Sequence, residues 1–164
     1  MPILITFIWI FLGLTLQVLF FNHLPLAGGV VLSYLYMVVR MPVDWNRNLQ
    51  ILTGFVVGLL ADIFCNTPGL HALACTTTMW VRLPLLHMFV VQDEIKNGCP
   101  TYYRLHFSVF SRYLLSVLLV HCVILFVTEA FSFFNLWHLI LKILFSIVLT
   151  YVFLLVADTA NTTK

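Results

Sequence analysis

Long stretches without a charged side chain constrain the fold of this sequence more than any other feature. Residues 1–39 contain no Asp, Glu, Lys or Arg, and further uncharged apolar runs follow. A transmembrane helix needs about 20 mostly apolar residues to cross a hydrocarbon core about 30 Å thick. Only 9% of the 164 residues are charged, against about a quarter in soluble proteins. We therefore predict an all-α, polytopic integral membrane protein with one domain, residues 1–164.

The apolar runs predict about six membrane spans. They cover residues 3–21, 25–41, 48–64, 70–90, 108–130 and 136–157. The first is interpreted as a retained span rather than a signal peptide, because it lacks a basic leading region and a small-residue cleavage site. The second is the weakest, because it stops at Arg40 and Pro42. A re-entrant segment is the alternative there.

The basic residues gather on one side of the six-span arrangement. That side holds both termini and the loops near 40–47 and 91–107, with Arg40, Arg47, Lys96, Arg104, Arg112 and Lys164. The opposite loops, at 22–24, 66–69 and 131–135, contain no Lys or Arg. Positive charge marks the cytoplasmic side of membrane proteins, so both termini are predicted to be cytoplasmic.

A small-residue face with one carboxylate runs along the third predicted span. Gly54, Gly58 and Asp62 are four residues apart, so they lie on one helix face. Glycines at this spacing let another backbone approach closely in lipid. A carboxylate at the bilayer centre costs about 2.5 to 3.5 kcal/mol, so Asp62 is expected to face protein. The alternative is a solvated helix end, because Pro68 and Gly69 form a turn soon after.

We expect Asp62 to be a structural polar anchor rather than a catalytic acid. A helix N-terminus favours an anion, and the fourth predicted span begins just after the Pro-Gly turn. The predicted partners of Asp62 are therefore the backbone amides at that helix start and the His71 imidazole.

Three other ionisable residues, Arg82, Glu129 and Lys142, lie within or at the edge of predicted spans. Glu129 and Lys142 are expected to pair between the fifth and sixth spans, with snorkelling of Lys142 as the alternative. Arg82 precedes Pro84, which tends to kink a helix. We expect Arg82 to snorkel to the cytoplasmic boundary, and binding to carbonyls exposed by the kink is the alternative.

The sequence offers little support for catalysis or for nucleic-acid binding. The net charge is only +2 and the basic residues are dispersed. The four cysteines form no C-x-x-C pair, and only His121 among the six histidines is expected deep in a span. Hydrolase and phosphate-loop motifs are missing. We therefore predict no catalytic residue, no cofactor, no metal and no nucleic-acid partner.

Residues 58–74, GLLADIFCNTPGLHALA, resemble MreD, a small multispanning protein family of the bacterial cell-elongation machinery. The family pattern is a glycine, an aspartate one turn later, and a Thr-Pro-Gly or Pro-Leu-Gly turn into a new helix. Here the turn lacks a leucine between proline and glycine. The positions that fall on the pattern are Gly58, Asp62, Pro68, Gly69 and His71.

The resemblance implies a non-enzymatic protein of the bacterial inner membrane. Its implied partners are membrane lipid, MreC, and the RodA polymerase with its transpeptidase, which carry out lateral peptidoglycan synthesis. The implied fold is a compact six-helix bundle similar to the substrate-binding subunits of vitamin uptake transporters.

That likeness supplies the alternative function, uptake of a small molecule, because a shared fold does not fix function. An uptake subunit would enclose a pocket open to the outside and bind an energy-coupling partner through small-residue helix faces. The short outer loops and the scarcity of polar side chains favour the elongation machinery. A membrane-bound redox or enzyme subunit is disfavoured by the histidine depths and the missing motifs.

Overall fold

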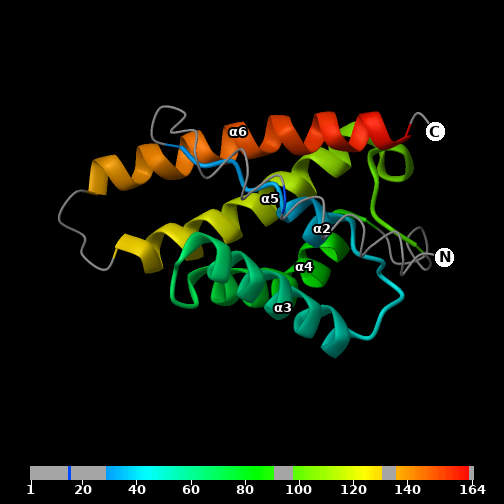
Figure 1. Cartoon of the computed structure of the whole chain (residues 1–164). Coiled ribbons are helices and arrows are strands. Elements are labelled where there is room, and N and C mark those ends of the chain that lie inside the picture. The colour runs from blue at the N-terminus through cyan, green and yellow to red at the C-terminus, as the bar shows by residue number, and fades with distance from the viewer. Residues whose placement is uncertain (1–14, 16–28, 91–97, 131–135, 163–164) are drawn as a thin grey trace.

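A computed structural model describes residues 15, 29–90, 98–130 and 136–162 of the chain. This part is helical, as Figure 1 shows. Its helices are α2 (Leu35–Arg40), α3 (Arg47–Cys65), α4 (Leu70–Phe89), α5 (Tyr102–Ala130) and α6 (Leu136–Thr162). The predicted all-α class is confirmed for these ranges. The predicted first span, 3–21, lies outside them apart from Thr15.

Three of these helices are long and apolar enough to cross a membrane: Arg47–Cys65, Arg104–Ala130 and Leu136–Thr159. They coincide with the predicted third, fifth and sixth spans, which supports a membrane protein. A count of six spans stays a prediction. Helix α4 coincides with the predicted span at 70–90, but its 20 residues include three threonines, two histidines and an arginine, which lower its hydropathy. Helix α5 is interrupted at His106, where φ is 55°, so its continuous part begins near the predicted start at 108.

The segment predicted as the second span is not one continuous helix. Residues 29–34 are non-helical, and helix α2 is only six residues long. The prediction of a helix over 25–41 is therefore wrong for 29–34, and residues 25–28 lie outside the described ranges. All residues from 31 to 39 are buried. Non-helical backbone at membrane depth is stable only where protein covers it, and here the surrounding helices do so.

Two hydroxyl side chains of α6 bind the backbone of this non-helical stretch. The Val30 N–H donates to Ser146 Oγ at 3.0 Å, and the Leu32 N–H donates to Thr150 Oγ1 at 3.2 Å. Both hydroxyl residues are fully buried. Buried backbone groups almost always find a partner. Helix α6 therefore supplies the hydrogen bonds that a helical turn would have made.

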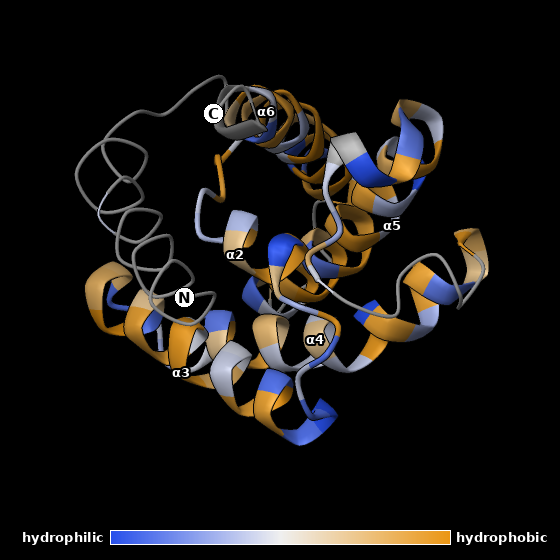
Figure 2. Cartoon of the chain, turned by 90° about the vertical axis from the view of Figure 1, so that its right-hand side faces the viewer, coloured by the Kyte–Doolittle hydropathy of each residue, from blue (hydrophilic) through white to orange (hydrophobic). Residues whose placement is uncertain are grey.

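Helix α2 lies at the centre of the bundle, with α3 and α4 on one side and α5 and α6 on the other (Figures 1 and 2). Buried apolar side chains from α2, α4 and α5 form the core around it. The outer faces of α3 and α6 carry exposed apolar side chains, which suits contact with lipid tails. They include Leu52, Phe55, Ile63, Leu144, Val148 and Val152.

The small-residue face of α3 packs against α4. A Cβ atom added to Gly58 would lie 2.5 Å from the His71 carbonyl oxygen and 2.6 Å from Ala72 Cα. A Cβ atom added to Gly54 would lie 2.5 Å from Met79 Cγ. The close approach predicted from the glycine spacing is present, and its partner is a helix of the same chain.

Candidate functional site

Asp62 ties the end of α3 to the start of α4. Its Oδ1 atom accepts hydrogen bonds from the Thr67 hydroxyl at 2.6 Å and from the His71 N–H at 2.9 Å. Its Oδ2 atom accepts from the Ala72 N–H at 2.8 Å. The predicted contact with backbone amides at this helix start is confirmed. The solvated alternative is wrong, because Asp62 is only 5% exposed.

The turn between the two helices follows from its residue types. Asn66 ends α3 in the left-handed conformation, with φ of 55°, which asparagine tolerates better than most residues. Pro68 lacks a backbone N–H and so cannot extend α3. Gly69 has φ of 81°, where a Cβ would be strained, and it precedes the first residue of α4. The turn reverses the chain and brings the first amides of α4 onto Asp62.

We expect Asp62→Ala to lower the free energy of unfolding by about 2 to 4 kcal/mol, because three donors lose a charged acceptor. The free energy of unfolding of Asp62→Asn should lie between that of Asp62→Ala and that of the original protein. The asparagine amide keeps one acceptor oxygen, but its NH2 group would face one of the three donors. Melting of the purified protein in detergent measures both. The exposed carboxylate of Asp44 gives the control, Asp44→Asn, with little expected change. An Asp62→Ala protein as stable as the control would contradict the anchor role.

The His71 imidazole has a different partner from the one predicted. Its Nδ1 atom is 2.8 Å from the Tyr34 hydroxyl, which is also 2.9 Å from Nε2 of His121. Nδ1 of His121 is 3.0 Å from the Thr78 hydroxyl, which donates to the Ala74 carbonyl at 2.6 Å. Tyr34, Thr78 and His121 are each at most 1% exposed. A continuous polar chain therefore crosses the bundle interior.

The direction of the hydrogen bonds in this row of side chains follows from its last member, Thr78. A carbonyl oxygen carries no hydrogen, so the Thr78 hydroxyl hydrogen lies on the bond to Ala74. The Thr78 oxygen then accepts from Nδ1–H of His121. A fully buried imidazole with only hydroxyl partners is neutral, so Nε2 of His121 accepts the Tyr34 hydroxyl hydrogen. The Tyr34 oxygen accepts from Nδ1–H of His71, and in the neutral ring Nε2 of His71 is left as an acceptor.

Arg82 lies inside the bundle and does not snorkel, contrary to the prediction. It is fully buried. Its Nε donates to the Tyr113 hydroxyl and one terminal nitrogen to Gln50 Oε1, each at 2.9 Å. The other terminal nitrogen donates to the Met41 carbonyl at the end of α2. The alternative prediction, a carbonyl freed by the Pro84 kink, is wrong too, because Met41 is far from Pro84 in the chain. It ends the central segment, which we define as residues 29–41, the non-helical stretch with α2 and its C-terminal residue.

Arg82 satisfies the C-terminal end of the short helix α2. The last carbonyls of a helix lack intrahelical donors and carry partial negative charge, so a guanidinium beside them is stabilising. Tyr113 adds a bond to the Val39 carbonyl at 3.3 Å, and Gln50 donates to the Trp45 carbonyl at 2.9 Å. Helices α3, α4 and α5 therefore hold the C-terminal end of the central segment, and Ser146 and Thr150 of α6 bind its N-terminal end.

Within the described ranges, two ion pairs join α6 to the rest of the bundle. Lys142 Nζ lies 2.7 Å and 2.9 Å from the two carboxylate oxygens of Glu129, so the predicted pair between α5 and α6 is confirmed. The Lys142 ammonium also lies 4.7 Å from the centre of the Phe126 ring. At the other end, Arg40 Nε is 3.7 Å from the buried Asp158 carboxylate.

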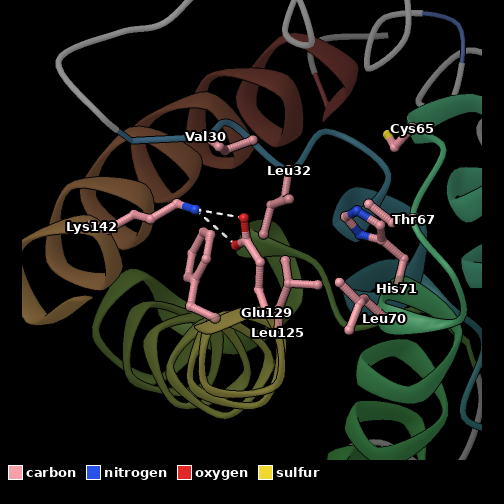
Figure 3. Close-up of a pocket in the computed structure, with 10 residues that line it drawn as sticks. Val30, Leu32, Cys65, Thr67, Leu70, His71, Leu125, Glu129 and Lys142 are labelled. Carbon is pink, nitrogen blue, oxygen red and sulfur yellow. Dashed lines mark hydrogen bonds and ion pairs between the residues drawn. The ribbon is translucent and has the colours of Figure 1, made fainter. Parts of the chain in front are cut away.

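A pocket of about 140 Å³ lies between the Glu129–Lys142 pair and His71. Figure 3 shows the ion pair on one side and the imidazole on the other, with Val30 and Leu32 of the non-helical stretch between them. Thr67 and Cys65 complete its polar lining. The pocket is therefore apolar in part and polar at two opposite walls.

The described residues contain no cluster of three or more His, Cys, Asp or Glu side chains that could hold a metal ion. The four cysteines are free. Cys99, before α5, is half-buried, and burial raises the pKa of its thiol although nearby arginines oppose this. Such a thiol is not activated as a nucleophile.

Sequence reasoning did not find Tyr34, Gln50 or Tyr113, and it gave His121 no role. Each has a partner on another element of the fold, and no local sequence pattern marks that partner. In comparisons with known proteins, no family model, no curated protein and no solved structure matches this chain.

Proposed function

We propose that this protein is a non-enzymatic, MreD-like membrane component of the bacterial cell-elongation machinery. It would lie in the inner membrane with both termini cytoplasmic, bind a single-span coiled-coil protein of the MreC type, and support a RodA-type polymerase and its transpeptidase. The observation that carries the proposal is the Gly58-to-His71 motif, on which the resemblance rests. It forms one structural unit in which Asp62 is fully engaged in holding two helices together.

A structural role for the motif fits a scaffold better than an enzyme. A catalytic carboxylate needs access to a substrate proton, within about 3 Å or through one water. Asp62 is 5% exposed and accepts three hydrogen bonds from its own chain. The hydrogen bonds of the Asp62 carboxylate therefore stabilise the fold rather than bind a substrate.

Two observations favour this proposal over vitamin uptake. Pockets for molecules of drug or vitamin size measure about 300 to 1,000 Å³. The pocket beside His71, on the predicted outer side, measures about 140 Å³. A wider, more open hollow of about 620 Å³ lies at the start of α3, lined by Arg47 and Leu49, at the opposite end from where an outward-open substrate pocket is expected. The small-residue face at Gly54 and Gly58, which an uptake subunit would offer to its coupling partner, is already packed against α4.

Co-isolation from native membranes tests the proposal. The chain would be tagged after Lys164 and purified in mild detergent, beside a tagged, unrelated multispanning protein as control. We expect a single-span coiled-coil protein of the MreC type to co-purify with this chain and not with the control. Recovery of an ATP-hydrolysing coupling module without any such protein would contradict the proposal and favour uptake.

A further inference from the structure

The pocket between Glu129, Lys142 and His71 has no role in the proposed scaffold function. We propose that it binds a small primary-ammonium group that also carries an acid group, as in the ethanolamine headgroup of a phospholipid or in a small free amino acid. The inference rests on three properties of the pocket, which are its hydrogen-bonding character, its size and its position.

The pocket walls offer mainly hydrogen-bond acceptors. The Thr67 hydroxyl hydrogen is used on Asp62, so only its oxygen lone pairs remain. The direction of the Tyr34–His121–Thr78 chain leaves Nε2 of neutral His71 as an acceptor. The Glu129 carboxylate is 45% exposed and adds two more acceptor atoms. A ligand that satisfies these walls must bring N–H or O–H donors, and an ammonium group brings three together with the positive charge that suits Glu129.

Lys142 provides for the acid group of such a ligand. Its ammonium donates to both Glu129 oxygens and lies against the Phe126 ring, and it is 25% exposed. A zwitterion could exchange partners with this pair, its ammonium going to Glu129 and its acid group to Lys142. The exchange keeps every charge paired, so it avoids the cost of an isolated ion at an apolar site.

The size of the pocket limits the ligand to a small group. A cavity of roughly 150 Å³ holds a molecule the size of benzene, about six non-hydrogen atoms. The 140 Å³ available here therefore fits an ethanolamine unit or a small amino acid. The apolar walls, from Leu70, Leu125 and Leu32, suit the methylene carbons of such a ligand.

The position of the pocket favours a lipid headgroup as one source. It lies where α3 ends and α4 begins, and where α5 ends, beside the turn 66–69, which contains no Lys or Arg. With both termini cytoplasmic, this turn lies at the outer boundary of the membrane, which is the depth of lipid headgroups.

Native mass spectrometry of the full chain released from nanodiscs tests the inference. The discs would contain equal amounts of phosphatidylethanolamine and phosphatidylcholine, which share the phosphate but differ in ammonium N–H donors. We expect phosphatidylethanolamine to be retained roughly tenfold over phosphatidylcholine. Glu129→Gln should abolish this preference, and Asp44→Asn, which removes a carboxylate at the other end of the bundle, should keep it.

A second arm separates the two sources of the ligand. Calorimetric titration with alanine would show binding, lost in Glu129→Gln, if the natural ligand is a free amino acid; this would also support the inference. Equal retention of both lipids together with no alanine binding would overturn it. Lipid preference that survives Glu129→Gln in a folded protein would overturn it as well. The wild-type lipid comparison needs no variant, so a folding defect cannot obscure it.

Discussion

Arg82→Leu is expected to reduce the free energy of unfolding by about 3 to 5 kcal/mol. The leucine leaves the Met41 carbonyl, the Gln50 amide oxygen and the Tyr113 hydroxyl without their shared donor in the buried interior. Domains are commonly stable by only 5 to 15 kcal/mol, so much of the protein should fail to reach a monodisperse folded state.

The matched control for this change is Arg47→Leu. Arg47 is exposed at the start of α3 and donates one bond to the Trp80 carbonyl at 3.3 Å. Exposed substitutions usually change stability by less than about 0.5 kcal/mol. Melting of both variants in the same detergent gives the comparison. If Arg82→Leu and Arg47→Leu melted at the same temperature, the Arg82 guanidinium would have no part in holding the central segment.

Substitutions at Gly58 are expected to damage the fold more than the same changes at Gly54. A Cβ at Gly58 would meet the backbone of α4, at 2.5 Å from the His71 carbonyl and 2.6 Å from Ala72 Cα. A Cβ at Gly54 would lie 2.5 Å from Met79 Cγ, in a flexible side chain that can shift, and its nearest backbone atom, the Cys75 carbonyl oxygen, is 3.3 Å away. Overpacking typically costs about 1 to 3 kcal/mol and more where backbone must shift.

Gly58→Ala should therefore lower the melting temperature clearly, Gly58→Leu should prevent α3 and α4 from packing, and Gly54→Ala should have a smaller effect. The measurements are melting in detergent and the monodisperse fraction in size-exclusion chromatography. Normal stability of Gly58→Ala would show that the helices need no close approach there, and the packing role would have to be given up.

The parts of the site that sequence analysis predicted are local in the chain. Asp62 and the first amides of α4 are joined by one short turn, so a carboxylate followed by Pro68 and Gly69 was enough to predict the contact. Glu129 and Lys142 are only 13 residues apart in the sequence, and their opposite charges indicated the pair. In both cases the distance along the sequence limits the possible partners.

The parts that it missed depend on segments far apart in the chain. The position of Arg82 near the end of its predicted span favoured snorkelling. No local pattern shows that Gln50 and Tyr113 point toward it from other helices. The break at 29–34 had one signal in the sequence: Ser146 and Thr150 lie four residues apart within the mostly apolar stretch 143–157 of α6. Such a pair of buried hydroxyls on one helix face indicates a backbone that needs partners.

Depletion of the protein in its native cell tests the central claim most directly. An MreD-like component of the elongation machinery predicts that rod-shaped cells become round as the protein is lost, and that new peptidoglycan no longer appears along the side wall. The original gene should restore shape, and Asp62→Ala should not. Cells that keep their rod shape and side-wall synthesis while uptake of a small nutrient falls would contradict the account.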